Sequence, residues 1–344
     1  MINLDAYDYN LPKAMIAQYP EERRDFSKLM ILNKNQIKHK RFYQIISEIK
    51  AGDVIVRNNS KVIASNLKGQ KQTGGKVECL FLREIDPTNN LWLCLLKGRK
   101  LRSGTKLLFL DGQLQGTVIE WKKFGEFVVQ FSSPRTIKEI LREHATITLP
   151  PYIKVPQPDL SRYQTIYASK EGSVAAPTAG FHFTTELIYK LEKQGIQFVN
   201  VTLHVGYSTF MPLTPEILST HKMDPEFYSI PPQTIEVIEE CQSQNHQIIA
   251  VGTTTLKTLE SATNNKGKIT HPEGWSELFI APGYSFKSGV TRLITNFHMP
   301  KSSPLLMVCA FAGRERILRA YREAISQKYR FYSFGDAMLV DKEE

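Results

Sequence analysis

A run of small and polar residues around one histidine is the strongest chemical signal in the chain. Residues 173–183 read Ser-Val-Ala-Ala-Pro-Thr-Ala-Gly-Phe-His-Phe, so that His182 stands between Phe181 and Phe183. Small residues let a backbone approach a ligand closely, and aromatic rings offer stacking faces that exclude water. His182 is the side chain there that can exchange a proton near neutral pH. The segment is predicted to form part of a ligand site.

Similar groups of glycine, threonine and histidine follow apolar runs further along the chain. They are His204-Val205-Gly206, Ser208-Thr209-Phe210, Gly252-Thr253-Thr254-Thr255 and Thr295-Asn296-Phe297-His298. Binding residues are often carried on loops that a rigid scaffold positions. We therefore expect one site that is built from several loops.

The segment from Gly252 to Thr255 lies between an apolar strand and a helix. Backbone amides at a helix N-terminus, together with threonine hydroxyls, form an anion site. Ordinary helix capping explains the same residues equally well. Neither G-x-G-x-x-G nor a Walker A run occurs, which disfavours dinucleotide and nucleoside triphosphate binding.

The histidines also invite comparison with a metal site. His182, His204, His221 and His298 have Asp224 and Glu226 as acidic neighbours in the sequence, but their spacing matches no common ligand pattern. A metal-dependent hydrolase is therefore disfavoured, and each histidine could equally be structural. Glu226 is either a general base or amine partner, or a solvated loop carboxylate.

Composition describes a soluble protein. The 344 residues are 42% hydrophobic and 23% charged, and the longest apolar stretch, 304–313, is too short to span a bilayer. The first residues do not resemble a signal peptide, so a cytoplasmic location is expected. The four cysteines are scattered, which argues against a zinc knuckle or a disulfide framework.

The net charge of +10 suggests a polyanionic partner, although a basic surface can also serve solubility alone. The basic residues cluster along the sequence, and this clustering favours a polyanionic partner. One cluster contains Lys97, Arg99, Lys100, Arg102 and Lys106, and the other contains Lys34, Lys38, Lys40 and Arg41.

Hydrophobic periodicity predicts the elements that position these residues. A helix at 42–49 and a strand at 53–57 precede short β-like runs at 77–81, 91–96, 106–110 and 125–131, with an Asp111-Gly112 turn. Helices are then expected at 136–144, from 184 or 185 to 194, and at 232–241, 256–262 and 314–329, with strands at 198–203, 248–251 and 278–281. The fold class is an α/β main domain, 1–60 and 150–344, with an inserted small all-β barrel domain at 61–149.

Taken together, the motifs resemble the S-adenosylmethionine:tRNA ribosyltransferase-isomerase family of queuosine biosynthesis. The resemblance runs nearly end to end. It includes Tyr9-Asn10-Leu11-Pro12, Ile16-Ala17-Gln18, Arg24-Asp25, Gly52-Asp53, Asn58-Asn59, Pro150-Pro151-Tyr152-Ile153, Tyr163-Gln164-Thr165, the segment 175–183, Leu203 to Gly206, Thr295 to His298 and Ser333 to Met338.

This resemblance implies an enzyme that moves the ribosyl part of S-adenosylmethionine onto an aminomethyl-deazaguanine base at the wobble position of tRNA. Epoxyqueuosine-tRNA forms, and adenine and methionine leave. The family has an α/β domain with an inserted β-barrel and requires no metal. No cofactor is implied, because S-adenosylmethionine is a consumed substrate. A monomer without a membrane partner is expected.

The matching loops supply the predicted site residues. Catalytic roles are assigned to His182, Glu226 and His298. Substrate binding is assigned to Tyr163, Gln164, Thr178, Gly180, Phe181, His204, Thr209, Phe210, Thr253, Thr254 and Asn296. Binding of tRNA is assigned to Lys97, Arg99, Lys100 and Arg102. The family pattern leaves the individual acid and base roles open.

The chain departs from the family pattern in several loops. The departures are Ser60-Lys61 for Thr-Arg, Ala64-Ser65-Asn66 for Pro-Ala-Arg, Ser208 for Gly, Met211 for a basic residue, Asp224 for His and Lys257 for Arg. Lysine cannot reproduce the bidentate fork of arginine. A catalytically impaired or respecialised relative that binds structured RNA is the alternative.

Overall fold

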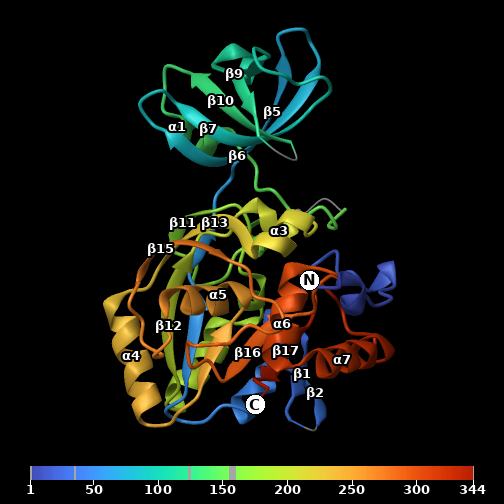
Figure 1. Ribbon diagram of the computed structural model, residues 1–344, viewed down its shortest axis with the longest axis vertical. Coiled ribbons are helices and arrows are strands. Elements are labelled where there is room, and N and C mark those ends of the chain that lie inside the picture. The colour runs from blue at the N-terminus through green and yellow to red at the C-terminus, as the bar shows by residue number, and fades with distance from the viewer. Residues whose placement is uncertain (1, 35, 123–124, 155–159, 344) are drawn as a thin grey trace. The chain divides into compact units, whose positions relative to one another are not determined.

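The chain forms two compact units, Met1–Lys61 with Pro151–Glu344, and Val62–Pro150. The structure is a computed structural model that describes residues 2–34, 36–122, 125–154 and 160–343. The first unit is an α/β fold and the second is an all-β barrel (Figure 1). The expected fold class is confirmed.

A nine-stranded mixed sheet forms the centre of the α/β unit. In spatial order its strands are β15 (Glu273–Leu278), β13 (Lys222–Ser229), β12 (Gln197–Leu203), β3 (Val54–Asn58), β14 (Ile248–Val251), β16 (Arg292–Asn296), β17 (Ala337–Asp341), β1 (Lys28–Leu32) and β2 (Ile37–Arg41). The four strands β12, β3, β14 and β16 are parallel. Their carboxyl ends therefore meet at one edge of the sheet, where loops commonly form a ligand site.

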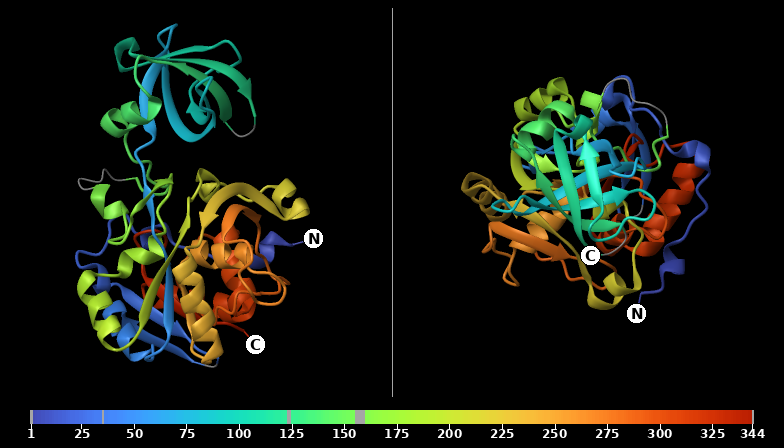
Figure 2. Two further views of the ribbon diagram at one scale, coloured as in Figure 1. Left: turned by 90° about the vertical axis from the view of Figure 1, so that its left-hand side faces the viewer. Right: turned by 90° about the horizontal axis from the view of Figure 1, so that it is seen from above.

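Helices cover both faces of this sheet. Alternate residues of one strand point to opposite faces, so that Met30 and Leu32 join one core and Leu29 and Ile31 join the other. The first core is closed by α4 (Pro232–Ser243), α5 (Thr253–Ala262), α6 (Ser303–Ala312) and α7 (Arg314–Ser326). The second is closed by α2 (Thr185–Lys193) and the 3-10 helices η4 (Phe42–Ser47) and η7 (Thr178–His182). Figure 2 shows α2 and α4 on opposite sides of the sheet.

The inserted unit is a closed antiparallel barrel. Its strands follow the order β10 (Glu126–Ser132), β7 (Leu91–Lys97), β6 (Lys76–Asp86), β5 (Asn66–Lys71), β8 (Lys106–Phe109) and β9 (Leu114–Trp121), and β9 pairs with β10 to close it. Helix α1 (Ile137–His144) packs onto this core. Its Thr136 cap and Glu139 form the reciprocal pair of hydrogen bonds that starts a helix well.

Local signals predicted several elements correctly. Helix α2 is capped by Thr184 and is followed by Gly195 at φ +87°, a left-handed conformation that glycine adopts without strain. The turn at Asp111 and Gly112 joins β8 to β9. The segment predicted as a helix at 42–49 is the 3-10 helix η4, which is shorter.

Two predictions about elements were wrong or incomplete. The strand expected at 278–281 is wrong, because β15 ends at Leu278 and the apolar residues Phe279, Ile280 and Ala281 are buried in a loop. Helix α6 had been noted only as an apolar stretch. It is buried on most sides, so no 3.6-residue stripe separates its polar and apolar faces.

Candidate active site

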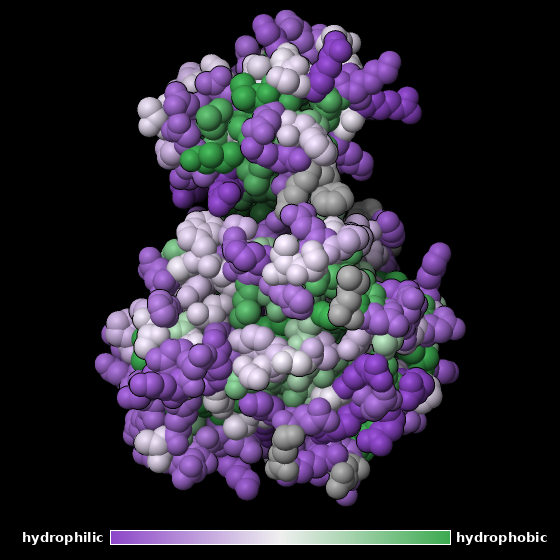
Figure 3. Space-filling model, in the orientation of Figure 1, coloured by the Kyte–Doolittle hydropathy of each residue, from purple (hydrophilic) through white to green (hydrophobic). Residues whose placement is uncertain are grey.

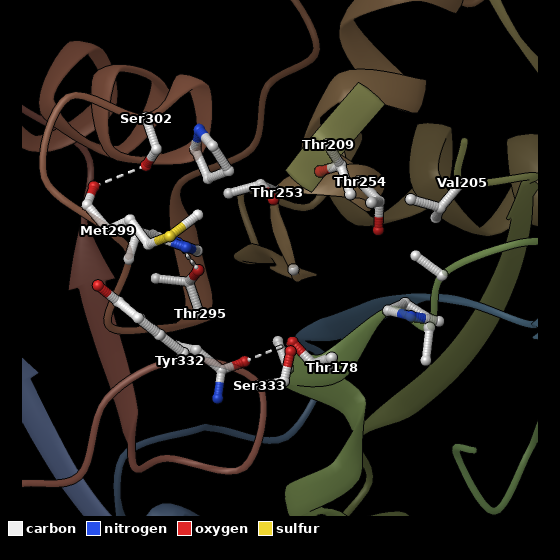
Figure 4. A pocket seen from close by; sticks show the side chains of 18 of the residues that line it. Thr178, Val205, Thr209, Thr253, Thr254, Thr295, Met299, Ser302, Tyr332 and Ser333 are labelled. Atoms are coloured by element: carbon white, nitrogen blue, oxygen red, sulfur yellow. Dashed lines mark hydrogen bonds between the residues drawn. The ribbon is translucent and has the colours of Figure 1, made fainter. Parts of the chain in front are cut away.

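Two adjoining cavities lie at the edge of the sheet where the parallel strands end. The first measures about 710 Å³, including the part open to solvent, and the second about 460 Å³. Val205, Thr209, Thr253, Thr254 and Pro304 line both cavities. Figure 4 shows threonines and other polar side chains from several segments around the first cavity. The two cavities therefore share one wall.

The N-terminus of α5 forms one wall of both cavities. Strand β14 ends at Val251, and Gly252 turns the chain at φ +87° into the helix. Gly252 supplies no side-chain cap, so the backbone amides of the first turn are available to a ligand. The Thr254 hydroxyl accepts a hydrogen bond from the side chain of Asn58 at 3.4 Å. This wall is suited to an anion such as a carboxylate.

His182 is buried behind the first cavity in a hydrogen-bonded chain. The Ser27 hydroxyl donates to the Arg24 carbonyl at 3.2 Å, which leaves its oxygen to accept from Nδ1 of His182 at 2.7 Å. Nε2 of His182 then accepts from the Asn296 amide at 3.2 Å. The side-chain oxygen of Asn296, Oδ1, accepts from the Thr178 hydroxyl at 3.1 Å. The network selects the Nδ1-protonated neutral tautomer of His182 and fixes the side-chain orientation of Asn296.

The electrostatic surroundings keep His182 neutral. Burial lowers its pKa to about 3, and the positive charges of Arg330 and Arg24 add to that shift. The ring also stacks on Phe42, with 5.0 Å between the ring centres. Protonation at Nε2 would remove the acceptor that Asn296 uses. His182 is thus built to hold Asn296, which lines the cavity, whereas His182 itself does not.

His298 lines the first cavity directly. Its Nε2 is 2.7 Å from the Thr295 hydroxyl, and its backbone amide donates to the Tyr321 hydroxyl at 3.0 Å. Burial lowers the pKa of the His298 imidazole to about 3. No described residue contacts its Nδ1 by a hydrogen bond. A neutral imidazole with one uncommitted nitrogen can accept or relay a proton at the cavity wall.

Glu226 lines the second cavity as half of a buried ion pair. It lies on β13, and its Oε2 is 2.9 Å from Nζ of Lys257 on α5. Its Oε1 accepts from the Gly206 amide at 2.7 Å. Both side chains are less than a tenth exposed. Breaking such a pair from one side leaves an uncompensated buried charge.

His204 follows β12 but lies outside both cavities. Its Nδ1 is 2.9 Å from the Ser60 hydroxyl, and Ser60 contacts the Ser173 hydroxyl at 2.5 Å. The Ser173 oxygen also accepts from the Val205 amide at 2.9 Å. This chain ties the backbone of Val205, a residue of both cavity walls, to the buried strands behind it.

The other predicted residues divide between the cavity and its support. The predicted residues that line the first cavity are Thr178, Thr209, Thr253, Thr254, Asn296 and His298. Phe181 and His182 line a separate cavity of about 280 Å³ with Arg24, Arg162 and Arg330. Tyr163 is buried against Phe181, and the backbone carbonyl oxygen of Gln164 accepts a hydrogen bond from the Arg24 side chain. The side chain of Phe210 lies outside the described part of the structure.

Gly180 is required by close packing. A Cβ atom added there would lie 2.0 Å from the Tyr167 hydroxyl and 2.7 Å from the Thr165 side chain. The glycine therefore lets the 178–182 turn pack tightly enough to bring Thr178 to Asn296.

Sequence reasoning missed several residues of the wall. Tyr152 and Tyr332 line the first cavity with 4.8 Å between their ring centres, and Met299, Ser302 and Ser333 complete that side (Figure 4). Tyr332 directly precedes the family-like segment Ser333 to Met338 but was not among the predicted site residues. Its position could have been inferred from Tyr152, which belongs to a family-like motif and packs against it.

The predicted tRNA-binding residues belong to the barrel unit. Lys97 ends β7, and Arg99, Lys100 and Arg102 lie in the exposed segment that leads to β8. Lys97 is 3.7 Å from Glu78, whereas no ion pair joins the other three side chains to another described residue. Three uncompensated cations are therefore presented to solvent.

The departures from the family pattern fall in different environments. Ser60 is buried against His204, whereas Lys61 pairs with Glu171 at the surface. Asn66 belongs to β5 of the barrel, Met211 is exposed and Asp224 lies on β13. The side chain of Ser208 lies outside the described part. Lys257 is the departure with direct access to the second cavity.

The described residues contain no cluster of three or more histidine, cysteine, aspartate or glutamate side chains that could hold a metal ion. None of their helices combines the length and apolar character needed to cross a membrane.

Comparisons with known proteins agree across the chain. The family model described as "Queuosine biosynthesis protein" matches residues 4–340. The S-adenosylmethionine:tRNA ribosyltransferase-isomerase of Desulforamulus reducens is 43% identical over 98% of this chain and 100% of its own length. The enzyme of the same name from a Thermoanaerobacter species is 45% identical, covering 96% of this chain and 98% of its own.

A solved structure is also similar. The crystal structure of the S-adenosylmethionine tRNA ribosyltransferase from Thermotoga maritima matches with a TM-score of 0.55 and 35% sequence identity. The match covers 97% of this chain and 99% of that chain.

Proposed function

This chain belongs to the queuosine biosynthesis protein family, and we propose that it transfers and isomerises the ribosyl part of S-adenosylmethionine onto a tRNA base. It is an enzyme of the S-adenosylmethionine:tRNA ribosyltransferase-isomerase class, the name carried by relatives of 43% and 45% identity over nearly their full length. The proposed acceptor is the aminomethyl group of a deazaguanine at the wobble position. The products are epoxyqueuosine-tRNA, adenine and methionine.

The observation that carries this proposal is the pair of adjoining cavities with different chemistry. Both contain the N-terminus of α5, to which the first adds two tyrosines and neutral polar groups and the second adds the buried pair of Glu226 and Lys257. A two-substrate transfer needs its donor and acceptor held side by side. We assign S-adenosylmethionine to the first cavity and the acceptor base to the second.

The amino-acid end of S-adenosylmethionine fits the α5 wall. Its carboxylate would be bound by the free amides of Thr253 and Thr254 and by their hydroxyls. The sulfonium would be favoured by the aromatic faces of Tyr152 and Tyr332. A sulfonium acidifies the adjacent carbon, so that a positioned base can start the transfer.

We assign the polar wall around Asn296 to the nucleoside. Asn296, fixed by His182 and Thr178, would orient it by hydrogen bonds. His298 has an uncommitted nitrogen at the wall and would move a proton to or from the leaving base. In this assignment His182 is a positioning residue.

Glu226 is assigned to the acceptor amine. An amine must be neutral to attack carbon, and a carboxylate can accept the proton that it loses. Lys257 pairs with this carboxylate in its buried position. No metal or cofactor is expected to take part, and a cytoplasmic monomer stays a prediction.

The test is a single reaction with three components. The purified protein, S-adenosylmethionine and tRNA that carries the aminomethyl-deazaguanine base should release adenine and yield the epoxyqueuosine nucleoside by mass spectrometry. Unmodified tRNA is the matched control and should release no adenine. Tight tRNA binding with adenine at the no-enzyme level would favour an impaired relative instead.

A further inference from the structure

The barrel unit has a polar hollow on its outer wall that the proposed chemistry does not use. It measures about 980 Å³, including the part open to solvent, and lies over the adjacent strands β8, β9 and β10. Two rows of side chains cross these strands in register: Lys106, Thr117 and Gln130, and beside them Leu108, Gln115 and Ser132. Figure 1 shows β9 and β10 side by side in the barrel.

The hollow presents hydrogen-bonding groups that the protein leaves largely uncommitted. No hydrogen bond or ion pair joins the side chains of Lys106, Thr117 or Ser132 to another described residue. The Gln130 amide donates to the Asn89 carbonyl at 3.4 Å, and its own oxygen stays available. Thr88, Asn89, Asn90 and Gln72 form the rim. This surface offers donors and acceptors together.

Charge indicates an anionic partner. Residues 62–150 contain 14 lysines and arginines against 8 aspartates and glutamates, so the barrel carries a net +6 of the chain's +10. Lys106 is the one charged residue among those described in the lining, which contains no carboxylate. In the sequence, Lys106 also ends the basic segment that begins at Lys97. Such a surface attracts phosphates.

The lining distinguishes double-stranded from single-stranded RNA. Proteins that bind single strands stack bases on exposed aromatic rings. The one aromatic residue described in this lining is Phe131, which is 3% exposed and packs inside the barrel. Double-helical RNA is instead recognised through its phosphates and 2′-hydroxyls, without base stacking. Hydroxyl and amide side chains around a lysine provide those contacts.

We propose that the β8–β9–β10 hollow binds a double-helical arm of tRNA through its 2′-hydroxyls and phosphates. That the RNA is tRNA rests on the proposed function, whereas the preference for an RNA duplex does not. Thr117, Gln130 and Ser132 contact ribose hydroxyls, and Lys106 contacts a phosphate. The barrel thereby holds the tRNA body while the target base is bound elsewhere.

The experiment measures binding of the full-length protein to three probes without modified bases: an RNA duplex of about 16 base pairs, the DNA duplex of the same sequence and one RNA strand. Wild type should bind the RNA duplex about tenfold more tightly than either other probe. Thr117→Ala/Gln130→Ala should lose about tenfold in affinity for the RNA duplex and bind the DNA duplex as before.

Two lysines make a matched pair. Lys106→Ala should lower the slope of log affinity against log salt by about one, for RNA and DNA duplexes alike. Lys122→Ala removes an exposed barrel lysine that already pairs with Glu120 at 2.7 Å, and it should leave the slope unchanged. Thermal melting of each variant should match wild type, because all these side chains lie on the barrel surface.

Two results would overturn the inference: unchanged RNA-duplex preference in Thr117→Ala/Gln130→Ala, or tighter binding of the single strand by wild type. Adenine release by wild type on modified tRNA separates this inference from the proposed function. If wild type releases adenine but the hollow variants bind RNA as wild type does, the RNA-binding role of the hollow is rejected and the proposed reaction is not. Loss of duplex preference in those variants without any adenine release supports the hollow and rejects the proposed reaction.

Discussion

The two units of this protein carry their charges in opposite ways. In the α/β unit the key charge is buried and compensated, since Glu226 and Lys257 pair at 2.9 Å beside a cavity. In the barrel unit the cations of Arg99, Lys100 and Arg102 are exposed and make no ion pair with other described residues. A compensated buried charge is suited to orienting a reacting group, whereas uncompensated surface charge attracts a polyanion over a distance.

Figure 3 shows the hydropathy of one face of each unit, and hydrophobic side chains are visible on both. On the visible face of the α/β unit, apolar side chains gather over α5 and α6 among hydrophilic surroundings. The second cavity is lined there by Met223, Leu278, Phe279 and Met307 beside the ion pair. An apolar lining strengthens the electrostatic interactions of the carboxylate that it surrounds. Changes in the two units should therefore affect different kinetic quantities.

The largest effect is expected at the buried pair. Glu226→Gln should lower turnover by about two orders of magnitude or more, because the acceptor amine loses its base. The substitution also leaves the buried Lys257 charge without its partner, so the free energy of unfolding should fall by about 3–5 kcal/mol. Calorimetry and adenine release measure the two effects.

A paired variant separates chemistry from folding in that experiment. Glu226→Gln/Lys257→Met removes both charges and should recover most of the lost stability without recovering turnover. Recovery of turnover in the double variant would show that Glu226 acts only through stability.

The next effect concerns the wall of the first cavity. Asn296→Ala and His182→Ala should each lower turnover by about two orders of magnitude, because both changes remove one oriented amide. The double variant should lose little more than either single one, since the residues act as a unit. Losses that multiply in the double variant would assign His182 a separate role.

A smaller effect is expected in the exposed basic loop. Arg99→Ala/Lys100→Ala/Arg102→Ala should weaken tRNA binding and lower its salt slope by about one for each lost phosphate contact. Adenine release at saturating tRNA should stay at the wild-type rate, because these residues lie in the barrel unit. An unchanged salt slope would place the tRNA surface elsewhere.

The buried imidazoles should make stability depend on pH. The pKa values of His182 and His298 are lowered from 6.5 to about 3 in the folded protein. Between these values the unfolded chain binds protons that the folded chain does not, so stability falls as pH drops from 6.5 towards 3. Urea titrations of His182→Gln/His298→Gln should show a shallower fall. If the stability of the double variant fell with pH as steeply as that of wild type, other titratable groups would be the cause of the fall.

The smallest effect is expected from restoring the family residue beside Glu226. Lys257→Arg keeps the charge and adds a planar fork with more donors. Turnover should change by less than about threefold, because the carboxylate stays paired, and melting should shift little. Steady-state kinetics against Lys257→Met provides the contrast. A large gain in turnover would show that lysine limits this enzyme.

Sequence reasoning was most successful where a local pattern fixes local structure. The helix expected at 136–144, the helix expected to begin at 184 or 185, the turn at Asp111 and the loop after Val251 were all identified from nearby residues. Strands β12, β3 and β14 were expected from their apolar runs, whereas the fourth parallel strand, β16, was not predicted. Their shared carboxyl edge then brings Thr178, Thr253 and Asn296 to one cavity.

The remaining features depend on contacts between distant residues. The pairing of Glu226 with Lys257 and that of His182 with Asn296 join elements far apart in the chain, and no spacing rule reveals them. Phe279 and Ile280 have the composition of a strand but form a buried loop, because they pack at the cavity. The low pKa of His182 also follows from burial, which only the fold supplies.

The central claim is that chemistry resides in the α/β cavities and tRNA capture in the barrel. Adenine release from S-adenosylmethionine, measured against the concentration of modified tRNA, tests it most directly. Wild type should release adenine. Glu226→Gln should lower the maximal rate and leave the half-saturating tRNA concentration unchanged. Arg99→Ala/Lys100→Ala/Arg102→Ala should keep the maximal rate and raise the half-saturating tRNA concentration. The reverse pattern, with the barrel variant losing the maximal rate and Glu226→Gln keeping it, would contradict the account.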